Sequence, residues 1–404
     1  MQGLVLEGGG ARGAYQIGAY KALVEEGFIF NGVSGTSIGA LNGALIVQGD
    51  AIRAYELWEN LHPSELFGIP LKSWSMLIDG DFQFSDIPEL FKTLQSLVRS
   101  KGLDTQKVKA LLKQIIIEDN LRKSPMDFGF VTYSLSDRKA LEYYKEDIPQ
   151  DEMVDYLMAS ANLPIFQVEK LGGKILIDGG VSDNLPVQLL IKKGYRELVI
   201  IRTFAIGVVR KFDKKGLKIL FIEPSEDLGN ILDFKPEKSK YLLQLGFFDV
   251  KRKLHQLKGQ SYYIESRNDD NYYLDLLKSF CTDDLDKLAE RMNLKGIPSY
   301  RLLFEHLMPL LSEALNLSKH ASYEDIVLGV AEWMAKALHL ARFKIYSVED
   351  FLSSIKDHPK IHKTFQPAKI LPSILIQNEL GARVFKENIM QEIAWFIIHQ
   401  GASE

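Results

Sequence analysis

The stretch that decides the fold runs from residue 4 to residue 43 and combines two glycine-rich turns with two short apolar segments. Its first part reads Leu4-Val5-Leu6-Glu7-Gly8-Gly9-Gly10-Ala11-Arg12-Gly13. Its second part contains Gly35-Thr36-Ser37-Ile38-Gly39, the G-x-S-x-G pattern of a nucleophile elbow, where a serine occupies a sharp turn between a strand and a helix. Gly35 and Gly39 remove side chains that would collide at such a turn. The two turns together indicate an oxyanion hole beside a nucleophile.

Strand and helix patterns alternate through the first two-thirds of the chain. Residues 3–6 and 32–34 are predicted to be short strands, and residues 14–25 and 38–47 are predicted to be helices. Further apolar strands are predicted at 128–134, 140–144, 174–177, 197–201 and 218–222. This alternation predicts an α/β layer fold with a mainly parallel sheet. The section from about 50 to 125 has a helical and aromatic character, which indicates an insertion over one face.

Helical patterns dominate after residue 265. They cover residues 283–294, 300–316, 322–344, 348–357 and 383–399. Val327, Val330, Met334, Leu338 and Ala341 line one face of the third segment. Ser322 and Ser347 each precede an aspartate by three residues, which predicts capping boxes.

The polar segment 266–271 marks a domain boundary. We therefore predict a catalytic α/β domain over residues 1–265 and a smaller all-helical domain over residues 266–404.

Composition narrows the class of protein. The 404 residues carry a formal net charge of −4, which gives no general attraction to nucleic acid. One cysteine, Cys281, excludes an intramolecular disulfide and suits a reducing compartment. No basic segment precedes the first strand, and no run of about 18 apolar residues occurs, so neither a signal peptide nor a membrane span is expected. We expect a cytoplasmic protein.

A serine nucleophile needs a base, and the position of the histidines argues against the usual one. Seven of the eight histidines follow residue 250, and the exception is His62. A Ser–His–Asp triad is therefore disfavoured. Asp178 is the better candidate, because it ends an apolar strand and two glycines, Gly179 and Gly180, follow it. The alternative is a simple Asp-Gly turn.

Three other features have competing interpretations. Gly8-x-Gly10-x-x-Gly13 also fits a dinucleotide-binding turn, but no acidic residue ends the second strand, and the serine elbow follows instead. Arg12 could orient the loop, attract an anionic head group, or simply start a helix at the surface. The basic residues of 205–258 are more typical of a solvated face than of a contact with anionic phospholipid.

Taken together, these motifs resemble those of the patatin-like phospholipase family over roughly residues 1–255. The segments Ala159-Ser160-Ala161-Asn162-Leu163-Pro164 and Asp178-Gly179-Gly180-Val181-Ser182-Asp183-Asn184-Leu185-Pro186 add to the resemblance. It implies a three-layer α/β/α fold and a Ser–Asp dyad, with neither histidine nor metal nor other cofactor. Ser37 would be the nucleophile and Asp178 the base. The oxyanion hole would come from the loop Gly8, Gly9, Gly10, Ala11, Arg12 and Gly13, chiefly from amides around Gly9, Gly10 and Ala11.

The hypothesis from the sequence is therefore a lipid acyl hydrolase of the phospholipase A or esterase type that forms an acyl-enzyme. Its partners would be a lipid or phospholipid substrate and, peripherally, a membrane surface, but no nucleic acid. The alternative is a membrane-binding or partner-binding scaffold whose elbow is vestigial.

Overall fold

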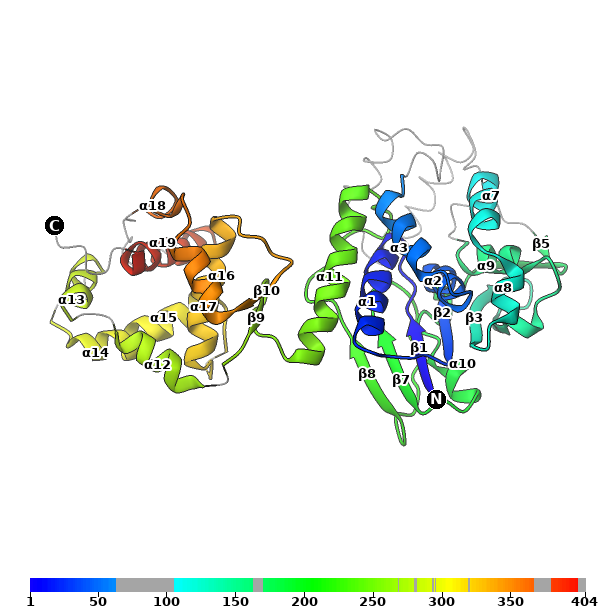
Figure 1. Cartoon of the computed structure of the whole chain (residues 1–404), viewed down its shortest axis with the longest axis horizontal. Coiled ribbons are helices and arrows are strands. Elements are labelled where there is room, and N and C mark those ends of the chain that lie inside the picture. The colour runs from blue at the N-terminus through cyan, green and yellow to red at the C-terminus, as the bar shows by residue number, and fades with distance from the viewer. Residues whose placement is uncertain are drawn as a thin grey trace. The chain divides into compact units, whose positions relative to one another are not determined.

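A computed structural model describes residues 1–62, 105–162, 170–267, 269–279, 282–292, 294, 296–318, 320–366 and 379–398. Most of the predicted insertion lies outside these residues, as do Leu163, Pro164, Cys281 and His399. The chain forms two compact units, Met1–Lys253 and Leu254–Glu404. Each unit is described by itself (Figure 1).

The first unit is built on one eight-stranded sheet. Its strands are β1 (Gln2–Leu6), β2 (Gly32–Thr36), β3 (Asp127–Ser134), β4 (Lys139–Tyr144), β5 (Lys170–Leu171), β6 (Lys174–Asp178), β7 (Glu197–Ile201) and β8 (Lys218–Ile222). Their order is β5-β6-β3-β2-β1-β7-β8, and β4 also pairs with β3. The pairs from β3 through β2, β1 and β7 to β8 are parallel, whereas β4 and β6 run antiparallel to β3. The predicted mainly parallel sheet is confirmed.

Helices cover both faces of this sheet, as the three-layer prediction requires. On one face α2 (Ile38–Val47) packs on β2 and β3, with α1 (Gly13–Glu25) beside it. On the other face α10 (Val187–Lys192) places Val187 and Leu190 in a buried cluster with Val5, Leu198 and Ile200. Alternate residues of β1 therefore point into different layers, since side chains along a strand alternate between its faces.

Helix α11 (Pro236–His255) completes the first face by packing closely on α1. A Cβ at Gly18 would lie 1.9 Å from the carbonyl oxygen of Leu243, and one at Gly246 would lie 2.0 Å from that of Tyr15. Each helix thus presents a glycine to the backbone of the other. The sequence analysis did not identify α11, because its basic residues were interpreted as a solvated stretch.

Four further α-helices lie in the described part of the first unit. They are α3 (Ala51–Asn60), α7 (Thr105–Ile115), α8 (Glu118–Lys123) and α9 (Met153–Ser160).

The second unit is mainly helical and has its own apolar core. Its helices are α12 (Asp270–Lys278), α13 (Thr282–Arg291), α14 (Ser299–Arg301), α15 (Met308–Ala314), α16 (Tyr323–Ala337), α17 (Val348–Lys356), α18 (Ile361–Thr364) and α19 (Glu379–Ile398), with a π-helical turn at Leu302–Leu307. The capping box of Ser322 and Asp325 starts α16 as predicted, whereas Ser347 accepts only the amide of Asp350. Among the described residues, no helix has the length and apolar character needed to cross a bilayer.

Three details of this unit differ from the sequence prediction. It is not all-helical, because β9 (Tyr263–Glu265) and β10 (Ile345–Ser347) form a parallel pair. Strands of three residues are too short to produce a recognisable apolar pattern. The pairing of β9 with β10 places residues 263–265 in this unit, which begins at Leu254, whereas the boundary was expected at 265. Finally, α16 ends at Ala337, so the exposed Ala341 does not line its buried face.

The contact between α1 and α11 gives a direct test of the fold. We expect Gly246→Ala to destabilise the first unit by about 1–3 kcal/mol, because the added methyl group must push apart two helix backbones. Urea unfolding followed by circular dichroism measures the change. Lys253→Ala, an exposed position near the end of α11, is the matched control and should change stability by less than about 0.5 kcal/mol. Equal stability of the two variants would contradict the close packing described here.

Candidate active site

Ser37 lies between β2 and α2 in the strained backbone conformation expected of a nucleophile elbow. Its φ of 57° and ψ of −128° are unusual for a residue with a side chain. A Cβ at Gly35 would lie 2.2 Å from the carbonyl oxygen of Gly39, and one at Gly39 would lie 2.5 Å from that of Leu6. Both flanking glycines are therefore required for the turn to close against β1.

Strand β3 brings Ser37 and Asp178 together. The last residue of β2, Thr36, pairs with Val131, and the last residue of β6, Asp178, pairs with the next residue of β3, Thr132. Because β4 occupies the other side of β3 over 129–134, β2 and β6 share one side of β3 and end at adjacent positions. The sequence analysis expected Asp178 at the carboxyl edge of the sheet. It reaches that edge on an antiparallel strand.

The two side chains form a short hydrogen bond. Ser37 Oγ donates to Asp178 Oδ2 at 2.6 Å, and the amide of Gly180 donates to Asp178 Oδ1 at 2.7 Å. Burial raises the pKa of Asp178 to about 6, although these two hydrogen bonds partly counteract the effect. Within the described residues, Asp178 is the only side chain that accepts a hydrogen bond from the Ser37 hydroxyl. His62, the one histidine of the early chain, is exposed.

Ser160, the last residue of α9, also supports the elbow. Its Oγ accepts a hydrogen bond from the amide of Ser37 at 3.1 Å and donates one to the carbonyl oxygen of Val131 at 2.7 Å. This fully buried hydroxyl therefore links the elbow to β3. The sequence analysis noted Ser160 within a family motif but gave it no role, since spacing alone does not show which backbone group a serine faces.

The amides of the glycine loop divide into two groups. Those of Gly8, Ala11 and Arg12 donate to the carbonyl oxygens of Asn184, Ile231 and Gly9, respectively. The amide of Gly13 donates within the helical turn. The amides of Gly9 and Gly10 donate no hydrogen bond to any described residue. Of the loop proposed from the sequence, these two N–H groups remain available to a ligand.

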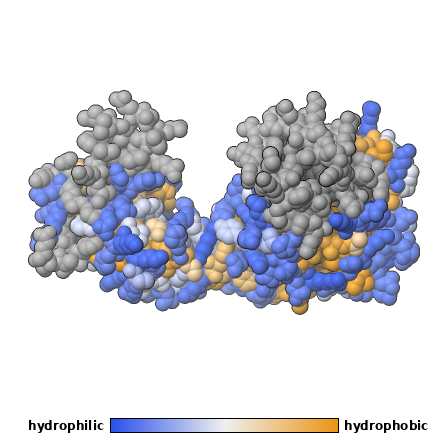
Figure 2. Space-filling view, turned by 90° about the horizontal axis from the view of Figure 1, so that it is seen from above, coloured by the Kyte–Doolittle hydropathy of each residue, from blue (hydrophilic) through white to orange (hydrophobic). Residues whose placement is uncertain are grey.

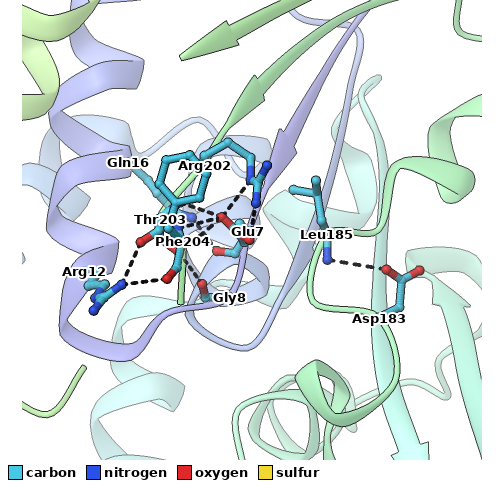
Figure 3. A network of polar contacts seen from close by, with 9 residues as sticks. All are labelled: Glu7, Gly8, Arg12, Gln16, Asp183, Leu185, Arg202, Thr203 and Phe204. Carbon is cyan, nitrogen blue, oxygen red and sulfur yellow. Dashed lines mark hydrogen bonds and ion pairs between the residues drawn. The ribbon is translucent and has the colours of Figure 1, made fainter. Parts of the chain in front are cut away.

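A buried carboxylate fixes the loop to the neighbouring β7–β8 connection (Figure 3). Glu7 accepts hydrogen bonds from the amides of Thr203 at 2.6 Å and Phe204 at 3.0 Å, and it forms an ion pair with Arg202 at 3.0 Å. A fully buried charge needs this number of partners, because an unpaired one would be costly. Sequence reasoning missed Glu7, since its partners lie some 195 residues away.

Arg12 contacts the same connection, and also the segment after β8, through its side chain. Its guanidinium donates to the carbonyl oxygens of Gly229 and Thr203 at 2.8 Å and of Phe204 at 2.9 Å. Burial lowers the pKa of Arg12, and Asp227, at 3.7 Å, counteracts that shift. Of the interpretations considered for Arg12, these contacts favour orientation of the loop and contradict a simple surface arginine.

The segment after Asp178 is held against the end of β2. Thr36 donates from its hydroxyl to the carbonyl oxygen of Asp183 at 2.8 Å, and the Asp183 carboxylate accepts the amide of Leu185 at 3.4 Å (Figure 3). Burial raises the pKa of Asp183 to about 6, while Arg210, 3.9 Å away, acts in the opposite direction. This second buried carboxylate stabilises the segment that follows the first.

The site therefore defines a class of α/β protein in which a serine elbow pairs with a carboxylate beneath a glycine loop. The family can be stated more closely. Residues 4–191 match the model of the patatin-like phospholipase family, and the first unit of this chain carries a domain of that family.

The curated relatives described here each match about half of this chain. Probable lipid hydrolase 463L of Invertebrate iridescent virus 6 is 30% identical over 193 residues, which are 47% of this chain and 63% of that protein. The uncharacterized protein YqhO of Bacillus subtilis is 27% identical over 223 residues, which are 48% of this chain and 68% of that protein. Lysophospholipase NTE1 of Cryptococcus neoformans is 26% identical over 200 residues, which are 49% of this chain but 11% of that much longer protein.

The raised pKa of Asp178 predicts a pH-dependent stability. Since the folded carboxyl group binds its proton more tightly than an unfolded one, folding is favoured near pH 3.8, and this stabilisation is lost as the pH rises through about 6. Asp178→Asn abolishes the titration. We expect the variant to exceed the wild type in unfolding free energy by up to about 3 kcal/mol at about pH 8, and by less as the pH falls toward 4.

Urea unfolding at several pH values measures this difference. Ile29→Ser, which replaces an exposed side chain that does not titrate, is the control and should show the same pH dependence as the wild type. A stability difference for Asp178→Asn that does not change with pH would contradict a pKa raised by burial.

Proposed function

We propose that this protein is a lipid acyl hydrolase that cleaves carboxylic esters of phospholipids or related lipids through Ser37 and Asp178. The observation that carries the proposal is the 2.6 Å hydrogen bond from Ser37 Oγ to Asp178 Oδ2, beside the two free amides of the glycine loop. The family of the domain supports a lipid ester as substrate. The names of two relatives, a lysophospholipase and a probable lipid hydrolase, support the same class.

In the first half of the reaction, Ser37 Oγ attacks the ester carbonyl carbon while its proton passes to Asp178 Oδ2. The carbonyl oxygen becomes an oxyanion, and the N–H groups of Gly9 and Gly10 stabilise it. Collapse of the tetrahedral intermediate breaks the bond to the leaving alcohol, which takes the proton from Asp178. The acyl group remains on Ser37.

In the second half, a water molecule attacks the acyl-enzyme and gives its proton to Asp178. Collapse then releases the fatty acid, and the proton returns to Ser37 Oγ. Asp178 must be ionised to act as a base in either half. A pKa of about 6 makes it a stronger base than an exposed carboxylate while keeping it mostly ionised at neutral pH.

Replacing the nucleophile tests the proposal. We expect Ser37→Ala to lose hydrolysis of a soluble short-chain ester by at least about 10³-fold and to lose labelling by a fluorophosphonate probe, because no acyl-enzyme can form. Asp178→Asn should label far more slowly than the wild type, since the base is missing. Circular dichroism checks that both variants are folded. Turnover retained by Ser37→Ala would overturn the proposal, and a folded wild type that never labels would favour the alternative of a scaffold with a vestigial site.

We further propose that the enzyme reaches its substrate through an apolar rim beside the site, defined as Val181, Phe204, Ile206, Val208 and Val209. These side chains are between 41% and 53% exposed. The backbone beneath them is fixed, because the amide of Phe204 is bound by Glu7 and that of Val208 donates to the carbonyl oxygen of Gly180 at 2.9 Å. Figure 2 shows that hydrophobic surface is exposed on this unit. A rigid loop that displays apolar side chains next to the base suits contact with a lipid surface.

The basic residues of 205–258 give less support to such a contact. Lys218 lies opposite Glu197 where β8 and β7 begin, which is the edge of the sheet away from Ser37. Lys251, on α11, pairs with Glu26, and Arg210 lies near Asp183. The basic stretch is therefore distributed over separate places, in keeping with a solvated face.

A matched pair of isoleucines tests the apolar rim. We expect Ile206→Ser to lower hydrolysis of phosphatidylcholine vesicles by about tenfold or more, with a much smaller effect on a soluble short-chain ester, because burial of each apolar side chain contributes about 1.5–3 kcal/mol. Ile29→Ser is the control: Ile29 is 78% exposed but precedes β2, at the opposite edge of the sheet. Equal losses from both variants on vesicles would contradict the proposed rim.

A further inference from the structure

The side chain of Asn184 fills a space bounded by three glycines from three separate segments. A Cβ at Gly8 would lie 2.1 Å from Asn184 Oδ1, and one at Gly180 would lie 2.9 Å from the same atom. A Cβ at Gly207 would lie 2.8 Å from Asn184 Cβ and Cγ. These distances are shorter than van der Waals contact allows, so the glycine loop, the base turn and the β7–β8 connection all close on this one amide.

The main chain of Asn184 connects the same segments. Its carbonyl oxygen accepts the amide of Gly8 at 3.0 Å, and its own amide donates to the carbonyl oxygen of Val208 at 2.6 Å. The amide of Val208 in turn donates to Gly180 at 2.9 Å. Any displacement of Asn184 would therefore move the loop that carries the free amides relative to the turn that carries the base.

Stability alone does not account for an asparagine here. The residue is 2% exposed, and its Nδ2 has no hydrogen-bond partner among the described residues. A buried donor left without a partner costs about 1–3 kcal/mol. An unpaired buried side-chain amide therefore calls for an explanation, and a role in the site supplies one.

We infer that Asn184 is a positioning residue that sets the distance between the oxyanion-stabilising amides and the Ser37–Asp178 pair, an inference that rests on the proposed function. A Cβ at Gly8 would lie 3.4 Å from Ser37 Cβ as well as against Asn184, and one at Gly180 would lie 3.1 Å from Asp178 Oδ1. Asn184 thus contacts the immediate neighbours of the nucleophile and of the base, and its side chain keeps Gly9 and Gly10 in register with both.

A rescue experiment tests this arrangement. Gly8→Ala should lower kcat for a short-chain ester by about 100-fold, because the methyl group displaces the loop from Ser37. Asn184→Ala should lower kcat by about tenfold, with KM nearly unchanged, because the loop is no longer held. The double variant should resemble Asn184→Ala within about threefold, since truncation of Asn184 opens the space that the new methyl group needs.

Gly9→Ala is the matched control for the rescue. Its added methyl group would meet Thr203 Oγ1 at 2.8 Å, so Asn184→Ala should not restore it. Thermal unfolding provides a readout independent of activity: the melting temperature lost in Gly8→Ala should return in the double variant. Equal impairment by Gly8→Ala in both backgrounds, or an unchanged kcat in Asn184→Ala, would overturn the inference. Failure of the proposed function itself would show separately, as turnover in Ser37→Ala.

The isosteric variant Asn184→Asp adds a readout that altered packing would not move. A second carboxylate beside Asp178 disfavours ionisation of Asp178. The acid limb of the pH profile of kcat/KM should therefore shift upward by about one pH unit. Asn184→Ala should leave that limb in place. An unshifted limb in Asn184→Asp would show that this side chain does not lie close enough to the base to position it.

Discussion

The pairing of β3 with two strands along one side is the constraint on which the site depends. Ser37 directly follows β2, which runs parallel to β3, and Asp178 ends β6, which runs antiparallel to β3. The ends of β2 and β6 pair with adjacent residues of β3. The 2.6 Å hydrogen bond then follows from sheet register rather than from a flexible approach of two loops. A register shift of one residue would turn the side chains to the other face and separate the pair.

A set of oriented charges and amides holds the rest of the site around this pair. Glu7 accepts the amide of Thr203, and Arg12 donates to the carbonyl oxygen of the same residue. These hydrogen bonds fix the glycine loop to the β7–β8 connection. Backbone groups satisfied in this way are rigid, and a rigid loop can present the amides of Gly9 and Gly10 without reorganisation. Glu7 and Arg12 thus hold the loop in place. The groups proposed to take part in the reaction beside Ser37 are the uncharged N–H groups of the loop and the carboxylate of Asp178.

Local features of the site could be predicted from the sequence, and long-range ones could not. The strand before Gly8, the elbow at Ser37 and the strand that ends at Asp178 depend on apolar periodicity and glycine placement, which are visible within a few residues. Glu7 was not identified, and Ser160 and Asn184 were noted within family motifs without a role, because the partners of all three are set by topology. The helix of residues 236–255 was missed for a different reason: its charged surface concealed buried Leu242, Leu245 and Val250.

The central position of β1 has a consequence for how this unit folds. β1 begins at residue 2, yet one of its two neighbours is β7, whose first residue is 197, and the helix that seals α1 begins at 236. Contacts between such distant segments carry a large loop-closure entropy and form slowly. During synthesis β1 therefore has no partner along one edge until β7 has been made. The glycine loop that follows β1 can therefore reach its contacts with Thr203 and Phe204 only after those residues have been made.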